Sequence, residues 1–187
     1  MANKDASFGL RLYSAGGGAA PANLQNKYRI ASGYSTAIFQ GDLVQVVTAG
    51  TIERVAAGGS GFILGVFNGC RYTDPTTSKE TFSNTYPGSI SASDIEAFII
   101  DAPLARFEIQ ADDTFPVTDL FGPVGDTSSG ISRMELDVTT GATTATLPLK
   151  ALDISQDPEN SDVSSANTNV VVMINNHLYA AGTTGLA

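Results

Sequence analysis

His177 and Cys70 are the side chains of this 187-residue sequence best suited to nucleophilic or acid–base chemistry, and each is the only residue of its type. A neighbouring histidine can activate a cysteine thiol, and both side chains can bind zinc. Neither residue lies in a recognisable nucleophile motif, and an isolated cysteine usually serves as a small apolar side chain. We therefore expect Cys70 to be buried, and residues 175–177 to turn the chain after a strand through side-chain hydrogen bonds.

Acidic side chains offer a second kind of chemistry, as cation ligands or as a general acid and base. Asp112 and Asp113 are adjacent, and Asp157, Glu159 and Asp162 follow later within one short stretch. Their spacing matches no EF-hand loop, and no pair stands out as an acid–base couple. A divalent ion at an interface is an alternative, but we expect no resident metal ion.

Glycine-rich stretches lie at residues 15–18 and 58–61. Neither has the Lys-Ser/Thr pair of a P-loop, and neither has the spacing and strand-to-helix context of a dinucleotide-binding fingerprint. We interpret both stretches as hinges or turns. Because no catalytic constellation is present, the sequence predicts a protein that is not an enzyme and has no cofactor.

The composition predicts a folded chain. Hydrophobic residues make up 42% and charged residues only 16%, whereas disordered chains have few apolar residues and a high charge density. No apolar run approaches the ~20 residues of a membrane span, and the first residues lack the apolar core of a signal peptide. We expect a soluble protein with no membrane partner.

Charge is unevenly distributed along the sequence, whose net charge is −9. Residues 1–31 contain four basic residues and one acidic residue, whereas residues 72–187 contain 16 acidic and four basic residues. Nucleic-acid binding needs a basic face, so we expect no nucleic-acid partner. The basic N-terminus could lie on an acidic neighbour, such as a copy of the same protein; the alternative is that this small excess is chance.

Residues 1–26 have the pattern of a docking arm. An apolar patch at residues 8–13 precedes Ala15-Gly-Gly-Gly-Ala-Ala-Pro21, a composition typical of a flexible hinge. We expect an arm that orders on binding and whose deletion leaves stability nearly unchanged. The alternative is a first strand that returns to the core. The side chains expected to contact a partner are Lys4, Phe8, Leu10, Arg11, Leu12 and Tyr13.

Residues 27–187 predict one β-rich domain. The clearest hairpin joins residues 43–48 and 51–55 across Ala49-Gly50. One short helix is expected at 116–121, and the polar stretch 73–94 predicts a long surface loop. The spacing of the short strands predicts an all-β sandwich or barrel, of jelly-roll or β-tulip type. Further strands are expected at 28–30, 36–39, 62–67, 96–100, 105–109, 132–138, 147–152 and 169–174.

The apolar positions of these strands predict a single core. Within residues 105–110, Phe107 and Ile109 should point inward, and Arg106, Glu108 and Gln110 outward, because side chains alternate along a strand. The expected core residues are Val44, Val46, Ile52, Ile63, Val66, Phe98, Ile100, Phe107 and Ile109.

Several motifs resemble virion proteins of tailed phages. The opening Met1-Ala-Asn-Lys-Asp-Ala-Ser-Phe-Gly-Leu-Arg11 resembles the start of one group, in which Pro-Phe-Gly-Leu-Arg follows an Asp-Ala pair; Ser7 replaces that proline. Later parts of the same group resemble Phe107-Glu-Ile-Gln110, Gly130-Ile-Ser132 and Ile174-Asn-Asn-His177. The series Gly41-Asp-Leu-Val, Gly50-Thr-Ile and Ile63-Leu-Gly-Val-Phe-Asn68 is similar to the β-barrel core of phage head decoration proteins.

The resemblance implies a capsid decoration, or cement, protein. Such proteins commonly sit as trimers on the outer shell and clamp adjacent capsomers against internal DNA pressure. The implied partners are the major capsid protein and other copies of this chain, in a homotrimer made in the host cytoplasm and located on the exterior of the virion. Alternatives are another virion structural protein, such as a tail-tube, head-fibre or connector-associated protein, or a glycan-binding β-sandwich module.

Overall fold

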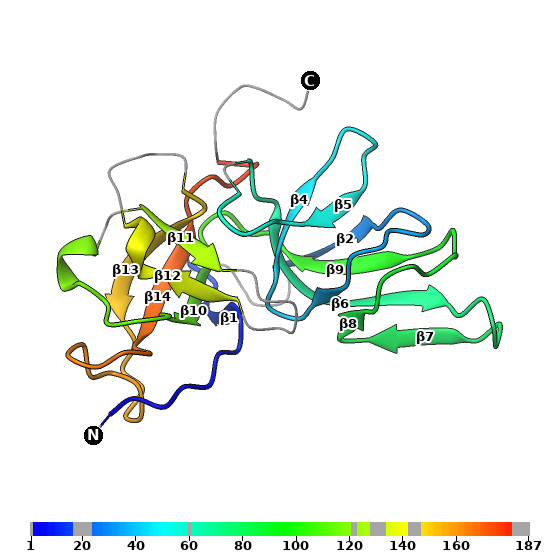
Figure 1. Ribbon diagram of the computed structural model, residues 1–187. Helices are drawn as coiled ribbons and strands as arrows, with labels where there is room; N and C mark the ends of the chain where they lie inside the picture. Colours follow the sequence, from blue (N-terminus) through cyan, green and yellow to red (C-terminus); the bar gives the residue numbers. More distant parts are fainter. Residues whose placement is uncertain are drawn as a thin grey trace.

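Two β lobes lie side by side (Figure 1). The computed structural model describes residues 2–16, 24–59, 61–120, 123–127, 134–141 and 147–180. All named strand pairs are antiparallel, and the only helical elements among the described residues are short 3-10 turns. The predicted all-β fold class is therefore confirmed.

The central lobe is a curled sheet with the strand order β2-β9-β6-β4-β5. A bridge between Ile30, just after β2, and Ile52 of β5 brings the two outer strands together, so that the sheet closes on itself. A sixth strand, β7, extends the sheet by pairing with the second half of β6, and a short β3–β8 ribbon packs beside it. The strands are β2 Gln25–Arg29, β3 Ile38–Phe39, β4 Leu43–Val46, β5 Ile52–Arg54, β6 Gly65–Thr73, β7 Glu80–Ser83, β8 Thr85–Tyr86 and β9 Glu96–Ile100.

The C-terminal lobe is a second curled sheet with the order β1-β10-β14-β13-β11-β12. It closes through a bridge between Ala111 and Leu136, reinforced by the Asp112 N–H, which donates to the Leu136 carbonyl at 3.0 Å. Strand β1 stays outside this closure as an edge strand on β10. The strands are β1 Arg11–Ser14, β10 Arg106–Gln110, β11 Pro123–Thr127, β12 Glu135–Asp137, β13 Leu149–Ile154 and β14 Asn169–Ile174.

The expected hairpin at residues 43–55 is confirmed as β4 and β5. Its turn contains Gly50 at φ +74°, a left-handed conformation that glycine adopts without a Cβ clash. The short helix expected at 116–121 is instead a single 3-10 turn, Val117–Asp119. Residues 121 and 122, the expected end of that helix, lie outside the described residues. Residues 130–132, one of the motifs of the resemblance, also lie outside them.

The apolar side chains form two clusters, so the prediction of one core is wrong. One cluster fills the central lobe and includes Val44 and Ile52. The other fills the C-terminal lobe and continues into the junction between the lobes, where Ile63, Val66 and Ile100 pack with residues of β10. Seven of the nine expected core residues are buried; Val46 and Phe98 are only half-buried. On β9 the inward residues are Ala97 and Ile99, which places Phe98 on the opposite face.

Residues 73–94 do not form the long surface loop that the sequence predicted. It contains β7 and β8, and Tyr86 is completely buried, with its hydroxyl donating to the Tyr34 carbonyl at 2.7 Å. The polar Ser- and Thr-rich sequence forms a hairpin because β6 continues through Thr73 and offers β7 a backbone to pair with.

The N-terminal residues also differ from the expected arm at residues 1–26. Residues 11–14 form β1 within a sheet, Leu10 is 4% exposed in the C-terminal cluster, and β2 begins at Gln25, before the expected domain boundary at residue 26. The segment thus follows the alternative of a first strand that returns to the core. Burial of Leu10 and backbone pairing with β10 provide the physical reason.

Candidate functional site

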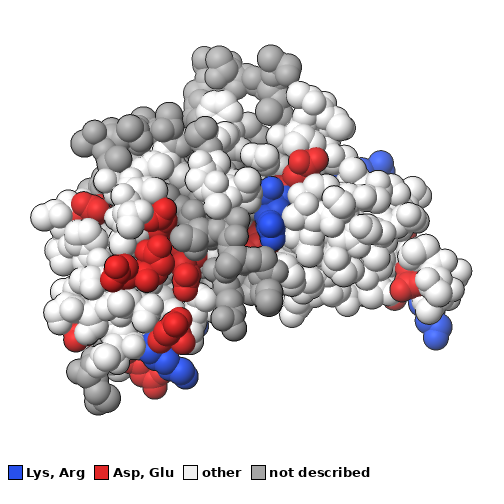
Figure 2. Space-filling model, in the orientation of Figure 1, with Lys and Arg blue, Asp and Glu red and all other residues white. Residues whose placement is uncertain are grey.

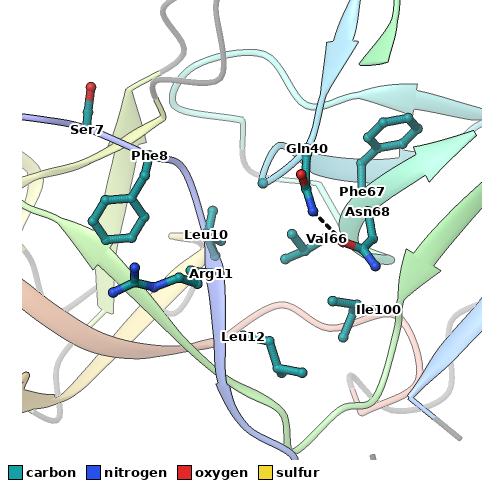
Figure 3. Close-up of a pocket in the computed structure, with 11 residues that line it drawn as sticks. Ser7, Phe8, Leu10, Arg11, Leu12, Gln40, Val66, Phe67, Asn68 and Ile100 are labelled. Atoms are coloured by element: carbon teal, nitrogen blue, oxygen red, sulfur yellow. Dashed lines mark hydrogen bonds between the residues drawn. The ribbon is translucent and has the colours of Figure 1, made fainter. Parts of the chain in front are cut away.

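A pocket of about 690 Å³ lies at the junction, between the N-terminal segment and the central lobe. Figure 3 shows residues 7–12 along one side of it and the ends of β6 and β9 along the other. Four of the six expected contact residues line it: Phe8, Leu10, Arg11 and Leu12. Lys4 and Tyr13 do not, and both are exposed. The facing wall is formed by Gln40, Gly41, Val66, Phe67, Asn68 and Ile100.

Two glycines permit the close approach of backbones that forms this pocket. The Leu10 N–H donates to the Gly41 carbonyl at 2.9 Å. Both Gly9, at φ +73°, and Gly41, at φ +95°, adopt left-handed conformations, and a Cβ on Gly9 would lie 3.1 Å from the Gly41 oxygen. Larger residues would be strained at either position and would separate the segment from the central lobe.

Arg11 forms an ion pair with Glu108 of β10. The Glu108 side chain is only 6% exposed, although Arg11 is 60% exposed, and the Ser155 hydroxyl donates to the second carboxylate oxygen at 2.5 Å. The Arg11 guanidinium also lies 4.7 Å from the centre of the Phe8 ring. A buried carboxylate is costly without partners, so Arg11 and Ser155 compensate for the burial of Glu108.

Residues 3–6 lie in an amide cradle, which we define as Gln110, Asn160 and Asn169, all at most 5% exposed. The Gln110 amide accepts from the Ala6 N–H at 2.9 Å and donates to the Lys4 carbonyl at 2.9 Å. Asn160 donates to the same carbonyl at 2.8 Å. These contacts recognise extended backbone rather than side chains.

Asn3 anchors the start of the same segment. Its amide nitrogen donates to the carbonyls of Asp162 and Ala166 at 2.8 and 3.0 Å, and its amide oxygen accepts from the Asp162 N–H at 3.2 Å. A side chain near the N-terminus therefore orders a loop more than 150 residues away in sequence.

His177 is fully buried at the junction. Its Nδ1 accepts from the Tyr179 N–H at 3.1 Å, as expected for a residue that turns the chain, and its Nε2 has no hydrogen-bond partner. Burial lowers the pKa of His177, and the neighbouring Asp101 raises it to a smaller extent. The imidazole is therefore neutral near pH 7.

Asp101, beside His177, is buried but well partnered. It accepts from Asn26 Nδ2 at 2.9 Å and from the Tyr28 hydroxyl at 2.5 Å, and Tyr28 in turn lies 2.7 Å from the Tyr179 hydroxyl. Burial, followed by the hydrogen bond to Asp101, raises the pKa of Tyr28. This network joins β2 to the chain that follows β14.

Cys70 and His177 make no hydrogen bond to each other. Cys70 is buried in the central-lobe cluster, as predicted, and its thiol contacts the Thr85 carbonyl at 3.6 Å. Burial raises the pKa of Cys70 to about 11, which keeps the thiol protonated and unreactive at neutral pH. His177 instead packs beside Ile63 and Tyr179.

The acidic residues considered as cation ligands serve local structure. Asp162 accepts from the hydroxyl and backbone N–H of Ser164, which lowers its pKa, and Asp157 accepts from Asn169 Nδ2. Asp112 accepts from the Val138 N–H. Among the described residues, no group of three or more His, Cys, Asp or Glu side chains is placed to hold a metal ion.

Charge differs sharply between the lobes. Residues 101–180 contain 12 acidic and three basic residues, whereas residues 24–100 contain six acidic and five basic residues. Figure 2 shows acidic side chains gathered on the face of the C-terminal lobe and few charges on the same face of the central lobe. The acidity of the protein is thus a property of one lobe.

Comparison with known proteins gives no relative: no family model, no curated protein and no solved structure matches the chain. Within the part of the chain that the structure describes, no helix is long and apolar enough to cross a membrane.

Sequence reasoning missed the polar residues that hold the N-terminal segment. Alternation along β10 assigned Glu108 and Gln110 to an exposed face, whereas they are 5% and 1% exposed because the segment covers them. The one available signal was the presence of Phe107-Glu-Ile-Gln110 among the motifs of the resemblance.

Proposed function

We propose that this chain is a structural virion protein that binds the outer surface of a phage capsid shell and stabilises it. It acts as a non-enzymatic cement, as a trimer, with the major capsid protein as its main partner. The proposal rests on the motifs that resemble decoration and virion proteins and on the place of those motifs in the fold.

The observation that carries the proposal is that motifs far apart in the sequence meet at one junction. Leu10 of Phe-Gly-Leu-Arg bonds to Gly41 of Gly-Asp-Leu-Val, and the Gly41 N–H donates to the Phe67 carbonyl at 2.8 Å. The Ile63 N–H donates to the carbonyl of Asn176, within Ile-Asn-Asn-His, at 2.8 Å. The direct contact between these motifs supports the resemblance.

The shape of the site also suits a structural role. Cys70 and His177, the side chains best suited to chemistry, are both buried. The apolar side chain of Leu12, 38% exposed, lines the pocket, and Tyr13, 52% exposed, follows it in β1. Exposed apolar groups beside a recess are suited to weak docking contacts. On a shell, symmetry repeats such contacts many times, so modest individual affinity suffices.

The test is rebinding to capsid shells from which the protein has been removed. Wild-type protein should sediment with the shells, and the double variant Leu12→Ser, Tyr13→Ser should bind at least about tenfold more weakly, the equivalent of about 1.4 kcal/mol. Phe82→Ser is the matched control, because Phe82 is 67% exposed on β7, away from the pocket. Binding of wild-type protein to tail structures but not to shells would contradict the proposal and favour a tail or connector protein.

A further inference from the structure

The N-terminal segment, residues 2–14, occupies an acceptor surface on the C-terminal lobe. Gln110 and Asn160 contact its backbone, Glu108 pairs with Arg11, and β1 pairs with β10. Charge also favours this docking. The segment contains two basic residues and one acidic residue, and the acceptor lobe at 101–180 is strongly acidic.

The acceptor surface is complementary to this segment. Without the segment, Glu108 would lose its arginine, and the Gln110 amide would lose its contacts with Lys4 and Ala6. Both side chains are buried because the segment covers them, so its departure would expose them to water and would lose the ion pair and these hydrogen bonds. The surface therefore favours this segment, whichever copy of the chain supplies it.

The segment itself is only lightly buried. In β1, Arg11, Leu12 and Tyr13 are all exposed, and the strand has one neighbour, β10, in the sheet order. Its firm attachments are Leu10, the cradle contacts and Asn3. Elements with few buried contacts open at the lowest free-energy cost, so this strand is among the first to leave its site.

The length of the connection to the body sets how far the segment can reach. Nine residues separate Ser14 from Leu24, and a chain of that length spans at most about 30 Å. A short tether holds its own segment at an effective concentration in the millimolar range. In dilute solution each acceptor surface is therefore occupied by the segment of its own copy. Once copies are crowded, a neighbour's segment competes for the same surface.

We infer that the segment 2–14 of one copy binds the acceptor surface of an adjacent copy, so that crowded molecules are linked by strand exchange. The partner is a second copy of this chain, and the contacts between copies are the β1–β10 pairing, the Arg11–Glu108 ion pair and the amide cradle. On a capsid, where copies lie side by side, exchange would link them into a continuous layer; only this last step rests on the proposed function.

The test uses full-length chains in solution without capsids. Ser14 and Arg106 are partners across β1 and β10, so cysteines at these positions lie within disulfide range. Ser14→Cys and Arg106→Cys are made in separate chains of different size, co-expressed, and oxidised with glutathione at about 10 μM and about 1 mM. For an effective concentration of about 1 mM, the exchanged fraction should rise about fiftyfold, from about one per cent to about a half.

Two controls make the outcome decisive. The variant with both cysteines in one chain should close an internal disulfide at low concentration, which demonstrates that the substituted chains fold. Ser14→Cys mixed with Lys79→Cys, an exposed position at the β6–β7 turn, measures random collision. Internal closure without any Ser14–Arg106 product at 1 mM would overturn the inference, as would equal yields from the Lys79 pair.

Discussion

Phe107 anchors the C-terminal lobe, since its side chain is completely buried among the residues of β10, β13 and β14. Phe107→Ala should lower the free energy of unfolding by about 3–5 kcal/mol, because it removes buried apolar surface and leaves a cavity. Urea denaturation measures the change. The matched control is Phe82→Ala, where the ring is 67% exposed and the change should stay within about 0.5 kcal/mol. A loss below about 1 kcal/mol for Phe107→Ala would mean that this face of β10 is not in the core.

Gln110 carries the attachment of residues 4–6, and its contacts with these residues are to backbone groups. Gln110→Ala should cost about 1–3 kcal/mol, because the buried Gln110 amide makes hydrogen bonds to the Lys4 carbonyl and the Ala6 N–H that alanine cannot make. Gln156→Ala is the control, as Gln156 is exposed and makes one contact of 3.4 Å with the Ile154 carbonyl. Equal unfolding midpoints for the two variants would contradict the role of the cradle.

His177 makes stability depend on pH in a defined direction. Its folded pKa is lowered below the ordinary value of 6.5, so the unfolded chain binds more protons in mildly acidic solution. Stability should be highest above pH 6.5 and should fall as the pH decreases from 6.5 towards the folded pKa. The buried Asp42 and the half-buried Asp112, whose pKa values are raised by burial, act in the opposite direction, because their protonation favours the folded state.

The measurement is the urea midpoint at pH 7.5 and at pH 5.5, for wild-type protein and for His177→Gln. Because His177 is the only histidine, the wild type should lose stability over this interval and the variant should lose less. Identical pH dependence in both proteins would rule out His177 as the cause.

At the scale of elements, the N-terminal segment belongs to the fold. Deleting residues 2–14 removes β1 and Leu10, whose burial alone is worth about 2–5 kcal/mol. For a chain of this size each kcal/mol shifts Tm by about 2–4 °C, so the deletion should lower Tm by at least about 4 °C. Leu12→Ser, at a position 38% exposed, is the control and should change Tm by less than 2 °C. An unchanged Tm after the deletion would restore the sequence-based expectation of a detached arm.

The sequence pattern predicted the strands well, but it predicted poorly which side chains on the second face of each strand are covered. The alternation in β10 correctly placed Phe107 and Ile109 inward, but it could not reveal that residues a hundred positions earlier cover Glu108 and Gln110. Similarly, Phe98 looked more suitable for the core than Ala97, but the register of β9 with β2 and β6 decides which face is inward. Both errors arise from long-range contacts, which local periodicity does not encode.

The site was predictable only in part, for a related reason. The apolar patch at residues 8–13 and Arg11 stand out in the sequence, and four of the expected residues meet at the pocket. Their partners on the body are ordinary polar residues without a motif, such as Asn160 and Ser155. Only the fold brings them to the segment.

At the scale of the whole molecule, the asymmetric charge limits how the protein can dock. The acidic C-terminal lobe would be repelled by an acidic shell, so the shell contacts should be mainly apolar and neutral-polar. Binding to stripped capsids should therefore persist at about 0.5 M salt, where exposed charge pairs are largely screened. Complete release at that salt concentration with the fold intact, measured by sedimentation and circular dichroism, would show that charge dominates the attachment.

Cryo-electron microscopy of intact phage particles would locate the protein on the particle and so test the proposed function. We expect density for two adjoining β lobes at symmetry-related positions on the outer surface of the capsid, with the pocket and β1 facing the shell or a neighbouring copy. An outer surface without such density, or density for this chain only in the tail, would contradict the proposed function.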